Sequence, residues 1–314
     1  MIKLIAKKKF IDSHYLEVST IIKNRIDRVI TDNGIYVGKP RKLISLPSKL
    51  KTYLLSLKNT LTLKSLINCK PENLEGRIIT LQRNQSAIFK KNTNSYKIVY
   101  NIFVKSAYHD LDKNVFIDNI GLETCPYCNR NYIYTLEKKD QIKPQVDHFY
   151  PKGLYPILAV SYFNLIPSCQ PCNGLEAKSE NDPTGKGLIN PYLIKHSHFK
   201  FGYEPYTINI LNPISDPSSI KIKFVDKIDG HLNVFKLDKL YNKHKDHVLE
   251  LIVKSKLKYT KKYREYLHNY KNLTFTDKEI DRMILGNYST TNEIHKRPLA
   301  KLYQDIGKEL GLIS

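Results

Sequence analysis

The chain has 314 residues, of which 41% are hydrophobic and 26% charged; this is enough for about two folded domains and excludes a wholly disordered protein. It has no run of about 18 apolar residues, and its basic N-terminus does not have the order of a secretory signal, so we expect a cytoplasmic protein without membrane spans. The formal net charge is +21, which favours polyanionic partners such as nucleic acid, although genomic base bias also produces Lys-rich chains.

Most of that positive charge lies in residues 1–115, which also carry apolar residues at helical spacing. Residues 1–100 hold 20 Lys and Arg against 6 Asp and Glu, a balance of +14. In residues 18–34, isoleucines recur near one helical face, and Gly34 is expected to end the helix: Ile21, Ile22, Ile26 and Ile30. Residues 48–68 repeat the pattern in leucines, whereas residues 96–113 fit either a helix or a buried strand. We therefore expect a basic, mostly helical N-terminal region.

The next region, residues 116–195, is nearly neutral and holds two Cys-x-x-Cys pairs. Cys69 stands apart from them and is expected to be a buried free thiol. Disulfides are not expected in a chain without a secretory signal, so the two pairs predict one tetrahedral, structural zinc site: Cys125, Cys128, Cys169 and Cys172. The 40 residues between the pairs exceed the spacing of a simple zinc ribbon, which indicates a folded segment between them.

The segment between the two pairs contains the stretch PQVDHFYPK, in which a strand is expected to end at Val146 and to expose Asp147 and His148. A second apolar run carries Asn164, and the chain then passes the second cysteine pair into a helix expected to begin at Asn173. This order of strand, loop, strand and helix brings these polar side chains together. Asp147 and His148 are either surface residues at a strand end or part of a metal site.

Residues 196–314 are expected to hold a short β region followed by helices. Residues 206–213 and 219–237 alternate apolar and polar residues, with Asp229-Gly230 as a turn between two strands. Helices are predicted from about Leu237, from Thr276 with Glu279 at capping-box spacing, and from 293 to 310 with Pro298 in the first turn and Gly311 past the end. The interleaved Tyr and Lys of residues 256–271 fit an aromatic helix face packed in a core or, alternatively, a base-stacking surface; His244 and His247 are expected to be solvated.

Five motifs in residues 125–192 together resemble the HNH endonuclease family, whose fold is the ββα-metal motif: CPYCNRNYI, VDHFYPK, YPILAVSYFNLIPSC, CNGLEAKS and INPY. The longer pattern is similar to HNH proteins of bacterial anti-phage defence, including the nucleases of Septu and of related retron-associated systems. The resemblance implies that such a nuclease works with a partner ATPase of the SMC/ABC type.

The resemblance also implies a role for each matching residue. His148 is expected to be the general base, Asp147 and Asn173 to ligate Mg²⁺ or Mn²⁺, and Asn164 to hold the loop that bears His148. Lys152 and Lys178 are candidate phosphate contacts. The family often has a lysine three residues after the helix asparagine, and this chain has a glutamate at that place.

These expectations combine into an α+β protein: a zinc-stapled ββα-metal core in residues 116–195, flanked by helical regions in residues 1–115 and 196–314. The expected function is metal-dependent hydrolysis of DNA, as the nuclease of an anti-phage complex. A ribonuclease acting on tRNA or another structured RNA is an alternative, because the hydrolytic chemistry is the same. A zinc-stabilised nucleic-acid-binding or scaffold module without catalysis is a further alternative.

Overall fold

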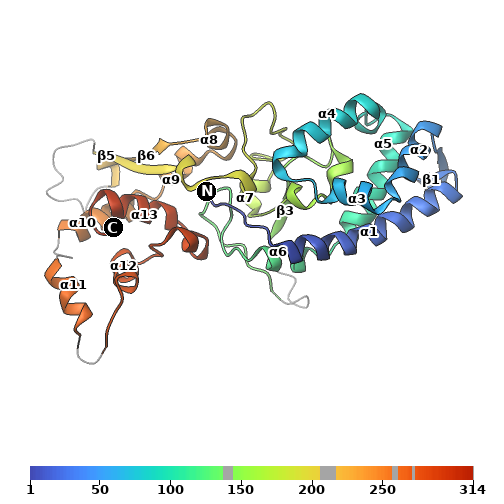
Figure 1. Ribbon diagram of the computed structural model, residues 1–314. Helices are drawn as coiled ribbons and strands as arrows, with labels where there is room; N and C mark the ends of the chain where they lie inside the picture. The colour runs from blue at the N-terminus through green and yellow to red at the C-terminus, as the bar shows by residue number, and fades with distance from the viewer. Residues whose placement is uncertain (137–143, 206–216, 257–260, 271–272, 314) are drawn as a thin grey trace.

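The computed structural model describes residues 1–136, 144–205, 217–256, 261–270 and 273–313. Figure 1 shows the N-terminal helices at one end of the molecule, the C-terminal helices at the other, and the segment with β3, β4 and α7 between them. The described residues form a mostly helical α+β protein with three separate two-stranded antiparallel sheets. No described helix combines the length and the apolar character needed to cross a membrane.

The N-terminal region is mostly helical, as predicted, and α1 is its longest element. This helix begins at Lys8, ten residues before the predicted start, and buries Ile22 and Ile26 completely. It ends at Thr31, so Gly34 does not end it but opens β1, where a side chain would clash with the backbone of β2. The elements of the region are α1 (Lys8–Thr31), β1 (Gly34–Val37), β2 (Lys42–Ser45), α2 (Ser48–Leu57), α3 (Thr60–Ile67), α4 (Leu74–Asn84), α5 (Asn94–Tyr100) and α6 (Lys113–Ile120).

The stretch of residues 96–113, which the sequence left open between helix and strand, is helical. The helix α5 continues directly into a π-helix, Asn101–Tyr108, which packs against α1 and buries Ile102 and Phe103 completely. A π-helix has an i→i+5 hydrogen-bond pattern, and such segments are frequent at functional sites. Its last residue, Tyr108, reaches the middle segment of the molecule, where its hydroxyl donates a hydrogen bond to the carbonyl of Val146.

The middle segment contains the predicted order of strand, loop and strand, but the first strand runs to His148 instead of ending at Val146, and Asp147 and His148 are buried, not exposed. β3 (Gln145–His148) pairs with β4 (Leu165–Ser168) in an antiparallel hairpin that sets His148 opposite Leu165. The predicted start of the next helix at Asn173 is wrong, because α7 (Gln170–Asn173) is a single turn that ends there. Gly174 follows in an extended conformation, which stops the helix and leaves Asn173 beside the second cysteine pair.

The C-terminal region contains a hairpin, but not the predicted one. β5 (Lys200–Pro205) pairs with β6 (Ile220–Asp226), whereas the strand expected at residues 206–213 lies outside the described residues. The Asp229-Gly230 turn is wrong, because these residues open a helix that buries His231, Val234 and Phe235 on one face. The helices are α8 (Asp229–Phe235), α9 (Leu237–Tyr241), α10 (Lys245–Lys256), α11 (Lys261–His268), α12 (Asp277–Leu285) and α13 (Ala300–Glu309).

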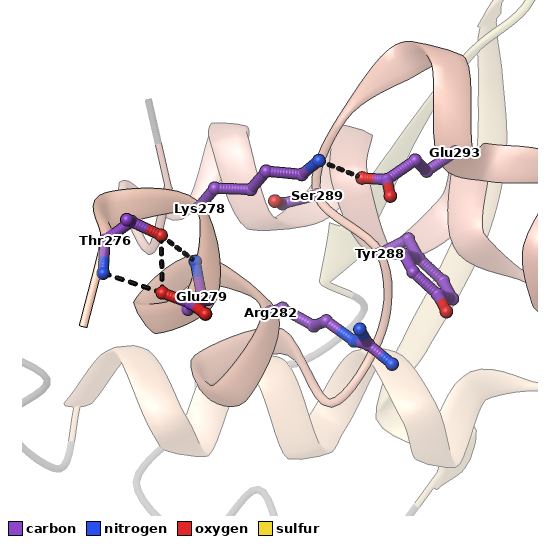
Figure 2. A pocket seen from close by; sticks show the side chains of 7 residues that line it. All are labelled: Thr276, Lys278, Glu279, Arg282, Tyr288, Ser289 and Glu293. Carbon is purple, nitrogen blue, oxygen red and sulfur yellow. Dashed lines mark hydrogen bonds and ion pairs between the residues drawn. The ribbon is translucent and has the colours of Figure 1, made fainter. Parts of the chain in front are cut away.

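The helix caps predicted for this region are confirmed in part. Thr276 and Glu279 form the capping box of α12, and Figure 2 shows their reciprocal hydrogen bonds. The last helix begins at Ala300 and not near residue 293, because a 3-10 segment, Thr291–Lys296, precedes it. Pro298 therefore lies before the helix, while Gly311 follows its end with a positive φ of 65° as expected.

Both ends of the chain pack onto the first cysteine pair. The backbone N–H of Ile2 donates to the carbonyl of Pro126 at 2.9 Å. The side chain of Asn129 donates to the carbonyl of Ile294 and accepts from the backbone N–H of Lys301 in α13, each at 3.0 Å. The loop of the first cysteine pair therefore bonds to both the N-terminal and the C-terminal segment, and Asn129 is fully buried there.

Candidate functional site

The four paired cysteines converge as the sequence predicted. Their sulfur atoms all lie within 4.8 Å of one another, and all four residues are buried. Zinc–sulfur bonds of about 2.3 Å in a tetrahedron place the sulfurs about 3.8 Å apart. The Sγ atoms of Cys128 and Cys169 are 3.9 Å apart, which fits this geometry. The four-cysteine site is therefore a candidate zinc centre with all four ligand positions supplied by the protein.

Local backbone turns and an amide hydrogen bond explain how the cysteines meet. Asn129 has a left-handed backbone (φ 49°), which closes the turn after Cys128. Asn131 Nδ2 donates to the sulfur of Cys169 at 3.3 Å, so the first loop also contacts the second pair. Hydrogen bonds from the other three thiols, the largest of them from Cys125, hold the pKa of Cys169 well below its ordinary range. A thiolate at this position is the form that binds zinc.

The hairpin of β3 and β4 places His148 in a buried and oriented state. The imidazole is 5% exposed, and its Nε2 lies 3.0 Å from the carbonyl oxygen of Ala159. Because a carbonyl oxygen accepts and cannot donate, Nε2 carries the proton and Nδ1 has a free lone pair. Burial, reinforced by the nearby Lys152 ammonium, lowers the pKa of His148 to about 3. The ring is therefore neutral at pH 7, with its unprotonated nitrogen at Nδ1.

Asn164 ties the loop between the strands to the end of β3. Its side chain is completely buried, and its oxygen accepts from the backbone N–H of Tyr150 at 2.7 Å. Its Nδ2 donates to the carbonyl of Tyr150 at 3.1 Å and to that of Leu158 at 3.0 Å. Leu158 directly precedes Ala159, the hydrogen-bond partner of His148. This arrangement is the one expected of a residue that holds the loop around His148.

Asp147 is also buried, with 3% of its surface exposed, and it has an unexpected partner. The hydroxyl of Tyr127, inside the first cysteine pair, donates to Asp147 Oδ2 at 2.6 Å. Burial raises the pKa of Asp147, and the Lys178 ammonium and the Tyr127 hydroxyl oppose that rise. The Lys152 and Lys178 charges act on the pKa values of both Asp147 and His148, which places the two side chains in one charged environment.

Asn173 lies beside the strand that carries Asp147. Its Nδ2 donates to Oε1 of Gln145 at 2.7 Å. Gln145 and Asp147 are two residues apart in β3 and so project to the same face of the strand. Carboxylate and amide oxygens are ligands that suit Mg²⁺, and a site with two of them leaves positions for water or a substrate phosphate. The role of Asp147 and Asn173 as ligands of a divalent ion stays a prediction.

The two lysines named from the sequence differ in exposure. Lys178 is completely buried, and its Nζ donates to the carbonyl of Asn181 at 2.9 Å and to that of His148 at 3.4 Å. A buried ammonium with two carbonyl partners supports the hairpin, and a phosphate contact of Lys178 stays a prediction. Lys152 is partly exposed, and its Nζ lies 4.6 Å from the ring centroid of Tyr108.

Sequence reasoning missed Tyr127 and Tyr108, whose side chains contact Asp147 and His148. Tyr127 is completely buried, and its ring stacks on that of Phe235 in α8 with centroids 4.5 Å apart. Its position between two predicted zinc ligands was a usable signal. Tyr108 belongs to the N-terminal region and packs edge-on against His148. No local pattern connects it with the hairpin.

Three further expectations concern side chains away from this site. His244 and His247 are not solvated but half-buried: His244 accepts from Nε of Arg130 at 3.0 Å, and His247 pairs with the hydroxyl of Tyr303. Tyr263 and Tyr266 of α11 are 38% and 57% exposed, so the described part of that helix does not bury an aromatic face in a core. Cys69 is a buried free thiol, as predicted.

A separate pocket of about 260 Å³ lies along α12, and Figure 2 shows the side chains that line it. Its two carboxylates are already engaged, since Glu279 bonds to Thr276 and Glu293 pairs with Lys278 at 2.8 Å. Arg282 lies over the ring of Tyr288, 4.2 Å from its centroid. This pocket contains none of the residues predicted for metal binding or catalysis.

Fold and site define a mixed α+β protein with a buried four-cysteine centre of zinc-binding geometry. Comparison with curated proteins shows distant homology to the Septu protein PtuB of Bacillus thuringiensis. The two are 29% identical over 126 residues, which cover 40% of this chain and 42% of that protein, less than half of its length. No family model and no solved structure matches the chain.

Proposed function

We propose that the protein is a metal-dependent nuclease of the HNH type, with His148 as general base. The observation that carries this proposal is the orientation of the buried His148: its Nε2–H is bound to the carbonyl of Ala159, which leaves Nδ1 as the nitrogen that can accept a proton. Asp147 lies beside it in the same strand, and Asn164 fixes the surrounding loop. A scaffold without catalysis gives no reason for this combination of side chains.

The chemistry of phosphodiester hydrolysis matches the residues at the hairpin. His148 Nδ1 takes a proton from the attacking water, and the hydrogen bond to Ala159 keeps the ring in the tautomer that this step requires. The Asp147 carboxylate and the Asn173 amide would hold a divalent cation, which supplies charge stabilisation on the phosphate and the leaving oxygen. The four-cysteine site has no open ligand position and serves as a structural staple.

The substrate and the biological setting follow from charge and from similarity. The net charge of +21 favours a nucleic acid, and we propose DNA as the substrate. The similarity to the Septu protein PtuB, together with the sequence motifs, supports a role as the nuclease of an anti-phage complex with a partner ATPase. The helical regions on both sides of the hairpin are large enough to provide the surface for that partner.

The test is a cleavage assay with plasmid, single-stranded DNA and total tRNA, each with and without added Mg²⁺ or Mn²⁺. His148→Gln should reduce the cleavage rate at least about 100-fold, because the base is lost while an amide N–H can still reach Ala159. His14→Gln is the matched control: His14 is also buried, and its Nε2 lies 2.8 Å from the carbonyl of Val160, the next residue in the same loop.

The outcomes separate the alternatives. Cleavage of plasmid that is lost in His148→Gln and kept in His14→Gln supports the proposal. Cleavage of tRNA with no cleavage of either DNA assigns the ribonuclease activity instead. Binding without cleavage of any substrate at every metal condition identifies a nucleic-acid-binding module, and equal cleavage by wild type and His148→Gln removes the base assignment.

A further inference from the structure

Residues 33–71 form a basic segment without any acidic side chain. They hold eight Lys and Arg and no Asp or Glu, although the whole chain has 30 acidic residues in 314. The segment comprises β1, β2, α2 and α3. Helix α1 neutralises two of its cations, since Lys58 pairs with Asp27 at 2.6 Å and Lys64 pairs with Asp12 at 3.1 Å. The other six cations of the segment take no part in these two ion pairs.

Three of those six cations lie at the tip of a β-hairpin. We call β1, β2 and the turn between them, residues 34–45, the basic hairpin. Its tip contains Lys39, Arg41 and Lys42, and all three side chains are exposed. Among the residues that the structure describes, no carboxylate oxygen lies within 4.0 Å of a charged nitrogen of these three. The tip is therefore a concentrated positive charge in contact with solvent.

The outer face of the basic hairpin carries two apolar side chains that are also exposed. Tyr36 and Leu43 lie directly opposite each other in the antiparallel register, so they project to the same face, where they are 55% and 42% exposed. The neighbouring pair, Ile35 and Ile44, projects to the other face, and Ile35 is buried there. Apolar side chains next to a basic tip match a nucleic-acid groove, in which sugars and base edges lie between two rows of phosphates.

The base of the basic hairpin is fixed to the helices of the N-terminal region. β1 packs on α1, and β2 packs on α5. The backbone N–H of Leu46 donates to the carbonyl of Asn33 at 2.9 Å, and Asn94 Nδ2 donates to the carbonyl of Ser45 at 3.3 Å. Figure 1 shows β1 at the N-terminal end of the molecule, away from β3. The tip is thus held in a defined place that is separate from His148.

We infer that the basic hairpin is a DNA-binding arm that lies in the major groove of a duplex, with Lys39, Arg41 and Lys42 on the phosphates and Tyr36 and Leu43 against the groove. The major groove admits a two-stranded β-ribbon, and contacts of Lys and Arg with phosphates position a protein on DNA without reading its sequence. The inference rests on the proposed function in taking DNA as the substrate. It adds a second contact with that substrate, away from the bond that is cut.

The arm is tested by equilibrium binding of the full chain to a fluorescein-labelled DNA duplex. Fluorescence anisotropy is measured over a series of salt concentrations without added divalent ions. The hairpin variant combines Lys39→Gln, Arg41→Gln and Lys42→Gln. We expect its Kd to rise at least about 50-fold at about 0.1 M salt, and its slope of log K against log salt to fall by about 2.7, because each phosphate contact contributes about 0.9.

A matched triple variant controls for the loss of net charge. It combines Lys239→Gln, Lys243→Gln and Lys308→Gln, which are exposed lysines of the C-terminal region. Its net charge changes by the same amount, but its Kd should rise less than about threefold, because charges far from the DNA are screened by salt. An equal loss of affinity in the two triple variants, or no binding by the wild type, would overturn the arm.

Tyr36→Ala tests whether the outer face enters the groove. We expect its Kd to rise about fivefold with an unchanged salt slope, because an apolar contact with DNA releases no counterions. Leu61→Ala is the control, since Leu61 is 77% exposed on α3 in the same basic segment, and its Kd should stay within about twofold of the wild type. A wild-type Kd in Tyr36→Ala would overturn the placement of this face in the groove.

The same variants separate the arm from the proposed function. A wild type that binds the duplex through the basic hairpin but cleaves no DNA contradicts the nuclease proposal alone. In a wild type that cleaves DNA, the hairpin variant should have a raised KM and a kcat within about twofold, because the hairpin holds the duplex and does not touch the reacting atoms. A hairpin variant with wild-type Kd and wild-type KM contradicts the arm alone.

Discussion

The four-cysteine site and the Asp147–His148 hairpin are neighbours in the chain and differ in how complete they are. The four sulfurs supply every ligand that a tetrahedral zinc needs, and the loop around them is held by both ends of the chain. At the hairpin, Asp147 and Asn173 are only the proposed ligands of a divalent ion, and His148 has a nitrogen without a proton. A closed site stabilises the fold, whereas an open one has positions left for water and substrate.

The largest effect expected from this contrast is on stability. Cys169→Ser should abolish zinc binding and lower the free energy of unfolding by more than about 4 kcal/mol, because structural metal binding contributes directly to folding. Metal analysis and denaturant unfolding measure both quantities. Cys69→Ser is the control, because this buried thiol lies outside the four-cysteine site. Its zinc content should stay the same, and its free energy of unfolding should fall by about 1 kcal/mol. A Cys169→Ser protein with wild-type zinc content would mean that the site is not a closed staple.

A smaller stability effect is expected at the hairpin. Asn164→Asp keeps the oxygen that accepts from Tyr150 but loses the two N–H bonds to the carbonyls of Tyr150 and Leu158. We expect the free energy of unfolding to fall by about 2–4 kcal/mol, because two buried carbonyl acceptors lose their donors. Cleavage should be lost, and the zinc content should stay that of the wild type. Hydrogen exchange of the loop amides and metal analysis check this. Wild-type exchange rates in the loop would contradict the holding role of Asn164.

The free energy of unfolding is also expected to depend on pH through the buried histidine His231. His231 is fully buried against the ring of Phe235, and burial lowers its pKa to about 3, well below the usual 6.5. The unfolded chain takes up this proton near pH 6.5 and the folded chain does not until about pH 3. The contribution of His231 to the free energy of unfolding is therefore fully present above pH 6.5. It decreases on acidification by about 1.4 kcal/mol for each pH unit.

His231→Gln removes this titration while keeping an amide group that can bond to the backbone N–H or carbonyl of Ile189. Urea unfolding at pH 7 and pH 5 should therefore show a pH dependence smaller by about 2 kcal/mol in the variant. His14, whose pKa burial lowers to about 4, keeps its own contribution in both proteins. An identical pH dependence in wild type and variant would show that His231 is not held neutral.

The parts that sequence predicted well are those that depend on neighbours in the chain. The Cys-x-x-Cys spacing predicted the four-cysteine site, and the Thr276–Glu279 spacing predicted a capping box. The same local reasoning failed at Asp229-Gly230, where burial of Val234 and Phe235 makes a helix out of a turn signal. Side-chain packing over the whole molecule outweighed the local preference there.

The parts that sequence could not predict are contacts between distant segments. Tyr108 reaches His148 across 40 residues, and nothing in the π-helix sequence points to that contact. Lys178 lies in a turn, where lysines are usually solvated, but tertiary packing buries it completely. Tyr127 was within reach of sequence reasoning, because a tyrosine between two zinc ligands is held rigidly, but its partner Asp147 was not.

The account depends most directly on Asp147 holding a divalent ion that is separate from the zinc. Mn²⁺ titration followed by electron paramagnetic resonance, on zinc-loaded wild type and on Asp147→Asn, tests this in one measurement. The variant keeps an oxygen for the Tyr127 hydroxyl and removes the charge. We predict one bound Mn²⁺ in the wild type, at least about tenfold weaker binding in Asp147→Asn, and one zinc in both proteins. Equal Mn²⁺ binding by the two proteins, or zinc lost with the carboxylate, would contradict the separation of the two sites.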